Sequence, residues 1–389
     1  MIASFGGKGT GEVGRIVVRG GTVLDPESGT EAVRDVLMVD GVLVDSPPDG
    51  GERVVDASGC HVSPGFIDLH THVFNHPLFG RTRVPADRIG VGQGVAAVVD
   101  AGSAGTPTID AFPEVVLATQ ATRVFAFINI GSPGLPNTGG GHASRPELCD
   151  LDGVVKAFQR HDGWLVGVKV LASASHTGMF GLEAVKLARK AAEITGRPLM
   201  LHIGNAPPVI DDVLDLLRPG DIVTHTYHGK TGGVLGHQDR IIPAFSDAVA
   251  RGVIVDLGHG RSSFSFRVCA RALDQGMPVH TISSDLHRGN LDRYSVSLAR
   301  TMTKMRTLGL SLKEVVEKVT LAPARAIGID TAGFGRLAPG LSTSLSIFRE
   351  RPGELTLEDA EGETRVADCF IEPVAVVLGD RVFEAGEPV

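Results

Sequence analysis

From residue 63 to residue 72 the chain runs Ser63-Pro64-Gly65-Phe66-Ile67-Asp68-Leu69-His70-Thr71-His72. Side chains alternate between the two faces of a β-strand, so a strand here would place Asp68, His70 and His72 on one face. The two histidines would lie about 7 Å apart along the backbone, close enough to bind one metal ion. For these ten residues taken alone, a half-buried strand whose histidines only make hydrogen bonds is the favoured interpretation. The rest of the chain has to decide between the two interpretations.

Downstream of this segment, short apolar runs alternate with stretches of helical spacing. We predict eight strands, over residues 66–72, 95–100, 124–130, 165–171, 198–203, 221–226, 253–258 and 279–285. Several are continuously apolar, which is typical of strands covered on both faces. Between them lie helices such as the one predicted over 181–194, which ends at Gly196. Eight β-α units over roughly 260 residues predict an α/β fold, a (β/α)8 TIM barrel; a doubly wound open sheet is the alternative.

The regions that flank the predicted barrel have a β-like pattern. Residues 15–25 and 35–44 each predict two strands, joined by Gly-Gly and Asp-Gly turns. After a predicted helix over 311–327, which begins at Ser311, apolar runs return at 344–348 and 373–383. We expect a small composite β-sandwich built from both termini. The predicted domains are therefore 1–62 and 333–389 for the two parts of the sandwich, and 63–332 for the barrel.

Barrel enzymes carry their active sites at the carboxyl ends of the strands, and six residues of metal-ligand type fall there. They are His70, His72, Lys169, His202, His225 and Asp285. Taken singly, Asp285 could cap a helix, and one histidine could be a hydrogen-bonded core residue. Lys169 lies inside an apolar strand, where an ammonium group is costly unless it is paired or chemically altered. Together the six residues indicate a metal site.

This set of residues resembles the amidohydrolase superfamily in its binuclear-metal form. The resemblance rests on Pro-Gly-Phe-Ile-Asp-Leu-His-Thr-His at 64–72 and on Lys169, His202, His225 and Asp285, in the superfamily's strand order. It extends to the segments 321–328 and 335–340, and so covers nearly the whole chain. The superfamily usually has Ala-Asp after the last glycine, where this chain has Leu341-Ser342. That departure falls in the predicted sandwich and affects no metal ligand.

The resemblance implies a role for each of the six residues. His70, His72 and Asp285 would hold one divalent ion, and His202 with His225 would hold the second. Lys169 would be carboxylated by CO2, and its carbamate would bridge both ions. Zinc suits this mixture of imidazole and oxygen ligands, although manganese, iron or cobalt also fit. A hydroxide bridging the metals would attack a polarised carbonyl, with Asp285 as general base and then acid.

Within the superfamily the chain is most similar to the amidohydrolase/deacetylase group that is often labelled dihydroorotase. Residues 256–266 and 281–287 carry this similarity. It implies a hydrolase acting on a small amide or ester, with removal of an acyl group such as acetyl favoured. A cyclic amidohydrolase of the dihydroorotase, hydantoinase or allantoinase type is the alternative. A non-catalytic metal-binding scaffold is an alternative from another class, although all six ligand positions are filled.

Five further residues are placed to contact a substrate. His176 follows Lys169, Tyr227 and His228 follow His225, and His259 and Arg261 lie in the loop after predicted strand seven. Arg261 could pair with a substrate carboxylate, or it could equally be a surface residue. The resemblance to the deacetylase group implies a small, carboxylate-bearing substrate.

Composition narrows the class of protein further. The 389 residues are 42% hydrophobic and 21% charged with a net charge of −8, which argues against a sequence-independent nucleic-acid binder. No apolar run approaches the ~20 residues of a membrane span, and the first residues lack a signal-peptide profile. The four cysteines are scattered without Cys-x-x-Cys spacing. We expect a cytoplasmic homo-oligomer that binds neither nucleic acid nor membrane.

Overall fold

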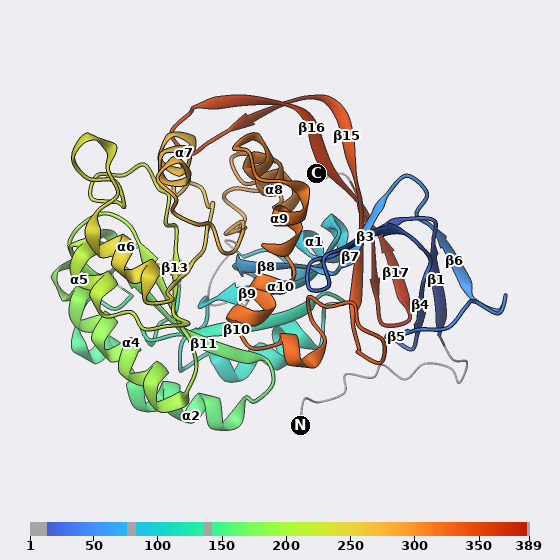
Figure 1. The fold of residues 1–389 in the computed structure, drawn as a ribbon. Coiled ribbons are helices and arrows are strands. Elements are labelled where there is room, and N and C mark those ends of the chain that lie inside the picture. Colours follow the sequence, from blue (N-terminus) through green and yellow to red (C-terminus); the bar gives the residue numbers. More distant parts are fainter. Residues whose placement is uncertain (1–13, 76–82, 136–141, 387–389) are drawn as a thin grey trace.

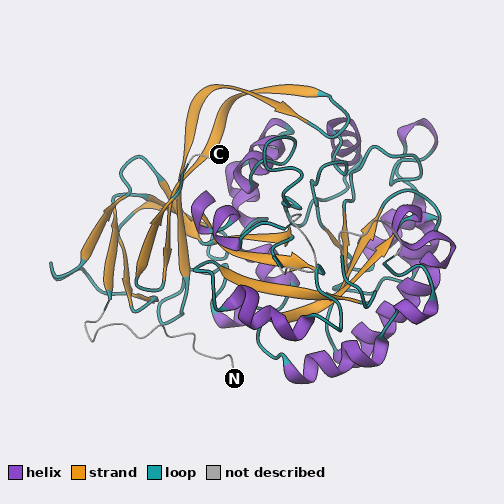
Figure 2. Cartoon of the chain, turned by 180° about the vertical axis from the view of Figure 1, so that it is seen from behind, coloured by secondary structure: helices purple, strands orange, loops and turns teal. Residues whose placement is uncertain are grey.

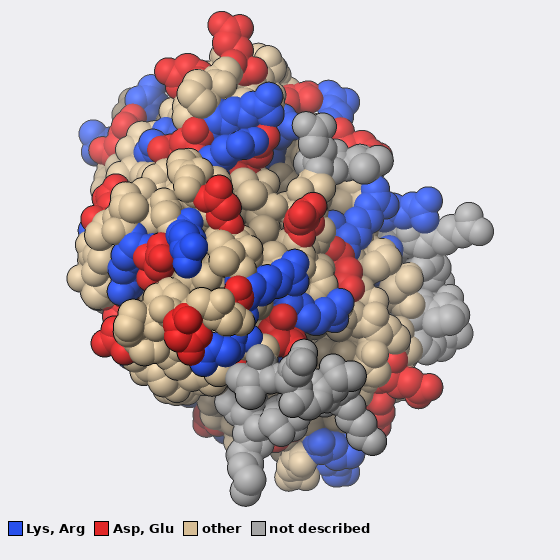
Figure 3. Space-filling view, turned by 90° about the vertical axis from the view of Figure 1, so that its right-hand side faces the viewer, with Lys and Arg blue, Asp and Glu red and all other residues tan. Residues whose placement is uncertain are grey.

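The computed structural model describes residues 14–75, 83–135 and 142–386 (Figure 1). A curved sheet surrounded by helices lies beside a layer of β-sheets, and the two parts are seen from behind in Figure 2. Lys and Arg are interspersed with Asp and Glu on the face drawn in Figure 3, without a broad patch of one sign. None of the helices in the described ranges has the length and apolar character needed to cross a membrane.

The barrel is built on a seven-stranded sheet with the order β14-β13-β12-β11-β10-β9-β8, in which every neighbouring pair is parallel. Its strands are β8 (Phe66–Thr71), β9 (Val95–Ala101), β10 (Arg123–Asn129), β11 (Leu165–Ala172), β12 (Leu199–Ile203), β13 (Ile222–Thr224) and β14 (Ile254–Val255). All residues of β8, β9 and β11 are buried, as expected for strands covered on both faces. The predicted (β/α)8 architecture is confirmed, with seven of the eight segments forming regular strands.

The eighth segment closes the barrel but is not a regular strand. Thr281 and Leu286 form isolated parallel bridges to Asp256 and Thr71, on the two neighbouring sides. The N–H of Asp285 donates to the carbonyl of His70 (2.7 Å). The prediction of a regular strand over 279–285 is therefore wrong, although its position is right. Asp285 has a φ of 50°, in the left-handed region, which interrupts the extended backbone.

Helices cover the outside of the barrel (Figure 1). The longer ones are α2 (Leu151–Arg160), α4 (Gly181–Thr195), α6 (Pro243–Ala250), α7 (Phe266–Asp274) and α8 (Leu298–Thr307), and the shorter ones are α1 (Ala86–Ile89), α3 (Ala174–Thr177) and α5 (Ile210–Asp215). The helix predicted to end at Gly196 is α4, and Gly196 adopts a left-handed φ of 64° there.

The helix predicted over 311–327 is instead two helices, α9 (Leu312–Glu317) and α10 (Leu321–Ala326). Ser311 does cap the first, in a capping box with Glu314. A continuous helix would need Pro323 to donate to the carbonyl of Val319, and proline has no N–H. That carbonyl instead accepts from the N–H of Ile67 in β8 (2.7 Å).

Both ends of the chain form the layer beside the barrel. One sheet has the order β5-β4-β1-β6 and the other β17-β16-β15-β7-β2-β3. Their strands are β1 (Arg15–Arg19), β2 (Thr22–Asp25), β3 (Thr30–Val33), β4 (Val36–Val39), β5 (Val42–Val44), β6 (Arg53–Asp56), β7 (His61–Pro64), β15 (Ser344–Glu358), β16 (Thr364–Leu378) and β17 (Arg381–Glu384). Ile16, Val23, Val62, Leu345 and Val377 share one apolar core. The predicted composite β-sandwich is confirmed.

The hairpin of β15 and β16 is longer than the sequence pattern predicts. Each strand has 15 residues, and the hairpin leaves the sandwich to arch over the barrel (Figures 1 and 2). Its turn contacts the loop that follows β14, where the N–H of Ala360 donates to Phe264 (3.0 Å) and Asp359 accepts from the N–H of Phe266 (2.8 Å). The C-terminal segment thereby reaches the side of the barrel that carries the candidate ligands.

Candidate metal centre

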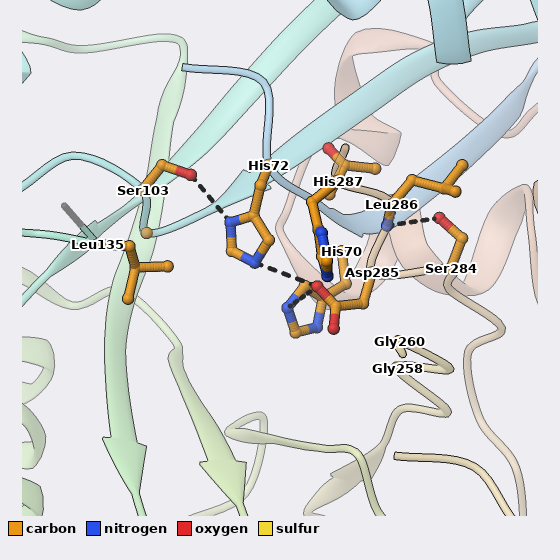
Figure 4. Close-up of polar contacts among 12 residues, drawn as sticks. His70, His72, Ser103, Leu135, Gly258, Gly260, Ser284, Asp285, Leu286 and His287 are labelled. Atoms are coloured by element: carbon orange, nitrogen blue, oxygen red, sulfur yellow. Dashed lines mark hydrogen bonds and ion pairs between the residues drawn. The ribbon is translucent and has the colours of Figure 1, made fainter. Parts of the chain in front are cut away.

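The six predicted ligands converge at the carboxyl ends of the barrel strands. The Oδ1 atom of Asp285 lies 3.1 Å from Nε2 of His72 and 3.6 Å from Nε2 of His70 (Figure 4). The Nζ atom of Lys169 lies 3.5 Å from the same nitrogen of His70. Residues from β8, β11 and the eighth segment therefore meet at one point.

The remaining two histidines complete the group. The ring centroids of His202 and His225 are 4.3 Å apart, and those of His225 and His70 are 4.8 Å apart. All six residues line a cavity of about 290 Å³. Nitrogen and oxygen atoms of His70, His225 and Asp285 lie within 4.8 Å of one another, an arrangement compatible with a metal ion.

A buried carboxylate that the sequence did not single out orients His70. Asp256 accepts from the hydroxyls of Thr224 (2.6 Å), Thr281 (2.7 Å) and Ser283 (2.8 Å). The Thr224 hydroxyl gives its only proton to Asp256, so it must accept from Nδ1 of His70, 2.9 Å away. His70 is thereby held as the Nδ1–H tautomer, and the lone pair on Nε2 faces Lys169 and Asp285.

Polar contacts at Nδ1 also hold the rings of His225 and His72. Nδ1 of His225 lies 2.6 Å from the carbonyl of Gly258, which can only accept, so Nε2 carries the lone pair. Nδ1 of His72 contacts the hydroxyl of Ser103 at 2.9 Å (Figure 4). The backbone of that turn is fixed by Asp100, whose carboxylate accepts from the N–H of Ser103 (2.7 Å).

Burial favours the neutral form of the basic groups in the cavity. It lowers the pKa of His225 to about 3, and it lowers the pKa values of His70 and His202 well below the usual range. Neutral imidazole is the form that binds metals. Burial also lowers the pKa of Lys169 to about 8, although nearby carboxylates oppose the shift. Burial disfavours ionisation of Asp285, but the hydrogen bond from His72 holds the pKa of its carboxyl below the ordinary value.

The loop after β14 packs tightly behind the ligands because of two glycines. Gly258 and Gly260 have φ values of 53° and 57°, which few other residues adopt. A Cβ atom on Gly260 would lie 2.5 Å from Oδ2 of Asp285, and one on Gly258 would lie 2.2 Å from the hydroxyl of Thr224. These glycines (Figure 4) let the loop approach the candidate ligand Asp285 and the hydroxyl of Thr224. Two of the candidate ligands, His225 and Asp285, also have positive φ values, of 64° and 50°.

Asp68 lies on the strand of His70 but not among the residues that line the cavity. Its carboxylate accepts from the N–H of Ser284 (3.0 Å) and from the hydroxyl of the same residue. Burial raises the pKa of Asp68 to about 7, against the effect of the Ser284 hydrogen bonds. Asp68 thus ties β8 to the eighth segment.

Of the five predicted substrate contacts, the structure places only His176 in the cavity wall. Tyr227 is fully buried and donates to the carbonyl of Pro278, and His228 is buried with Nδ1 accepting from the N–H of Lys230 (3.1 Å). His259 is buried against Lys304, and Arg261 is exposed.

Among the described residues, three polar or charged side chains outside the predicted set also line the cavity. They are Arg83, His142 and His287. The alternation that selected His70 and His72 also selects His287, because it lies two residues after Asp285. Arg83 and His142 lie in connecting segments with no periodic pattern, so no comparable signal marks them.

Fold and site together define a barrel hydrolase, and comparisons with known proteins agree. Residues 53–192 match the model of the family described as "Amidohydrolase family". A deacetylase of Agrobacterium fabrum (strain C58) is 33% identical over 89% of this chain and 84% of its own length. A deacetylase of Enterococcus faecalis (strain V583) is 37% identical over 84% of this chain and 87% of its own length. The chain belongs to the amidohydrolase family and is a hydrolase.

Solved structures give the same result. One described as a dihydroorotase has a TM-score of 0.90 at 29% identity and covers 97% of this chain and 99% of its own. One described as an adenine deaminase has a TM-score of 0.88 at 30% identity, with coverages of 95% and 99%.

Proposed function

We propose that the site holds two divalent metal ions, zinc in the first instance, and that the enzyme removes an acyl group such as acetyl from a small amide or ester. His70, His72 and Asp285 would hold one ion, His202 and His225 the second. The neutral imidazoles and the ionised Asp285 suit divalent cations. When bound, the two ions supply Lewis acidity toward a carbonyl and lower the pKa of a water molecule.

The observation that carries the proposal is the surroundings of Lys169. Two lysines of the described ranges are buried, Lys169 in β11 and Lys304 in α8. Nζ of Lys304 donates to three acceptors, Nε2 of His259 (2.6 Å) and the carbonyls of Tyr294 (2.8 Å) and Glu358 (2.6 Å). The Lys169 residue is 1% exposed. In the described part of the chain, its Nζ atom has only Nε2 of His70 within hydrogen-bonding distance.

A buried ammonium with so few acceptors is costly, and carboxylation by CO2 removes that cost. The amine forms an N–C bond to CO2 and loses a proton, which leaves a carbamate anion on Lys169. The pKa of about 8 favours this reaction, because only the unprotonated amine reacts. The carbamate would bridge the two metal positions.

Asp285 is the group that moves protons. Its carboxylate lies 3.1 Å from Nε2 of His72 at the centre of the ligand set, and a pKa below the ordinary value keeps it ionised. It would accept a proton from the attacking water through an Oδ atom and donate it to the leaving nitrogen or oxygen.

Deacetylation is favoured because relatives named deacetylases are 33 to 37% identical over most of the chain. A cyclic amidohydrolase is the second candidate, supported by the dihydroorotase structure with a TM-score of 0.90. A non-catalytic metal-binding scaffold is less well supported, because all six ligand positions are filled.

The substrate we propose is small and carboxylate-bearing. The deciding experiment is a screen of N-acetyl amino acids and acetylated 2-hydroxy acids against cyclic ureides and imides. Turnover of the acetyl compounds supports the deacetylase proposal; turnover of the cyclic compounds alone replaces it with the second candidate.

Location and assembly complete the proposal. Cys60, Cys149, Cys269 and Cys369 are all unpaired, which suits a reducing compartment such as the cytoplasm. A homo-oligomer is proposed as well, and light scattering of the purified protein tests it.

A further inference from the structure

A second cavity adjoins the metal pocket, and Arg83 lines both. This cavity has a volume of about 470 Å³, and its wall includes three guanidinium groups, those of Arg83, Arg88 and Arg288. Asp292 supplies the one carboxylate that the described residues contribute to the wall. The excess of positive charge marks a site for an anion.

Arg83 lies between the two cavities with donors to spare. One Nη atom donates to the carbonyl of Leu135. Its Nε atom is buried and has no hydrogen-bond partner within the described ranges. Burial lowers the pKa of Arg83, and the carboxylates of Asp100 and Asp285 oppose that shift. An unsatisfied buried N–H of a charged group is costly, and a bound carboxylate would remove that cost.

We propose that this arginine cavity binds the carboxylate of the substrate, with Arg83 as the main contact and Arg288 beside it. The proposal rests on the proposed function and names the residues that set its substrate class. The scissile acyl group lies in the metal pocket, and the carboxylate of the leaving portion lies across Arg83 in the second cavity. A guanidinium can bind a carboxylate through two parallel hydrogen bonds, which fixes the direction of the substrate.

The dimensions agree with this division. The two cavities, of about 290 and 470 Å³, fall together in the range of sites for small ligands. Arg261, the arginine that the sequence suggested for the same role, is exposed and lines neither cavity. We therefore assign recognition of the carboxylate to Arg83, in the segment that precedes α1, and not to Arg261 in the loop after β14.

The test compares a charged substrate with a neutral one of the same shape. N-Acetylleucine and N-acetylleucinamide, each in both enantiomers, are assayed with the metal-loaded protein and its Arg83→Met, Arg83→Lys and Arg261→Met variants. Arg83→Met should lower kcat/KM for the carboxylate about 10- to 100-fold and leave the carboxamide within about threefold. Arg83→Lys should recover part of the loss, because lysine keeps the positive charge but cannot form the two parallel hydrogen bonds of a guanidinium. The exposed Arg271 provides a control, Arg271→Met, that should change neither.

Two results would overturn the proposal: equal losses on both compounds in Arg83→Met, or a selective loss in Arg261→Met that Arg83→Met does not share. Thermal melting of each variant separates misfolding from lost binding. If the wild type hydrolyses neither compound, calorimetric titration with the same pair decides the subsite, and the screen of acetyl and cyclic compounds decides the proposed function separately. If Arg83→Met binds N-acetylleucine more weakly than the wild type does but binds N-acetylleucinamide equally well, the result supports the proposed carboxylate site. Unchanged binding of N-acetylleucine refutes that site.

Discussion

Replacing Thr224 by valine removes one hydroxyl at the base of the site and keeps the shape of the side chain. The hydroxyl accepts from Nδ1 of His70 (2.9 Å) and donates to Asp256 (2.6 Å). Its loss leaves the buried N–H of His70 without this acceptor, while Asp256 keeps the hydroxyls of Thr281 and Ser283. An unsatisfied buried group costs about 1–3 kcal/mol. Loss of a group that orients a metal ligand typically lowers metal affinity about 10- to 100-fold.

Two measurements separate these effects. Competition with a chromophoric chelator gives metal affinity, and urea unfolding of the metal-free protein gives stability. Thr226→Val is the matched control, because the Thr226 hydroxyl donates to the carbonyls of Val223 (3.0 Å) and Asp256 (3.1 Å) and does not contact His70. Both variants should lose stability, but only Thr224→Val should lose affinity. Wild-type affinity in Thr224→Val, or an equal loss in both, would refute the proposed orientation of His70.

Four further substitutions test the site and its support. Lys169→Ala should lose activity and regain part of it with a short carboxylic acid such as acetate; full activity without added acid would exclude the carbamate. Asp285→Asn should lower kcat at least about 100-fold while the protein stays folded by circular dichroism; a smaller loss would assign the proton transfer to another group. Gly260→Ala should lower activity at least tenfold, because its Cβ meets Asp285 at 2.5 Å, whereas Gly196→Ala, with open space around its Cβ, should lose only about 1 kcal/mol of stability. Lys304→Met should cost about 3–5 kcal/mol in urea unfolding, because three buried acceptors lose their donor; wild-type stability would contradict the contacts described for Lys304.

The sequence predicted that six residues of metal-ligand type come together, because their positions follow from simple geometry. Polar residues two apart on an apolar strand share a face, and parallel barrel strands bring their carboxyl ends together. Lys169 stood out because no structural role explains a lone lysine in an apolar strand. Both relations depend only on where the strands lie, and the first seven strands of the structure lie within a few residues of the predicted ranges.

The other features depend on tertiary contacts that leave no periodic signal. The eighth segment looks like a strand in sequence, but the left-handed backbone of Asp285 breaks it. β15 includes Pro352 and Gly353, two residue types that usually interrupt strands, so the sequence pattern does not predict one continuous strand there. Tyr227 and His228 follow His225, and His259 follows β14, yet all three side chains are buried. Arg83 faces the site from a connecting segment, where spacing carries no information.

Metal content is the most direct test of the central claim that six residues form a two-metal site. The protein is purified without chelator in medium supplemented with zinc and analysed by inductively coupled plasma mass spectrometry, alongside His70→Ala and His202→Ala. The wild type should contain close to two divalent ions per chain, and each variant should contain fewer. A well-folded wild-type protein that contains no divalent metal would contradict the account. So would two variants that each contain as much metal per chain as the wild type.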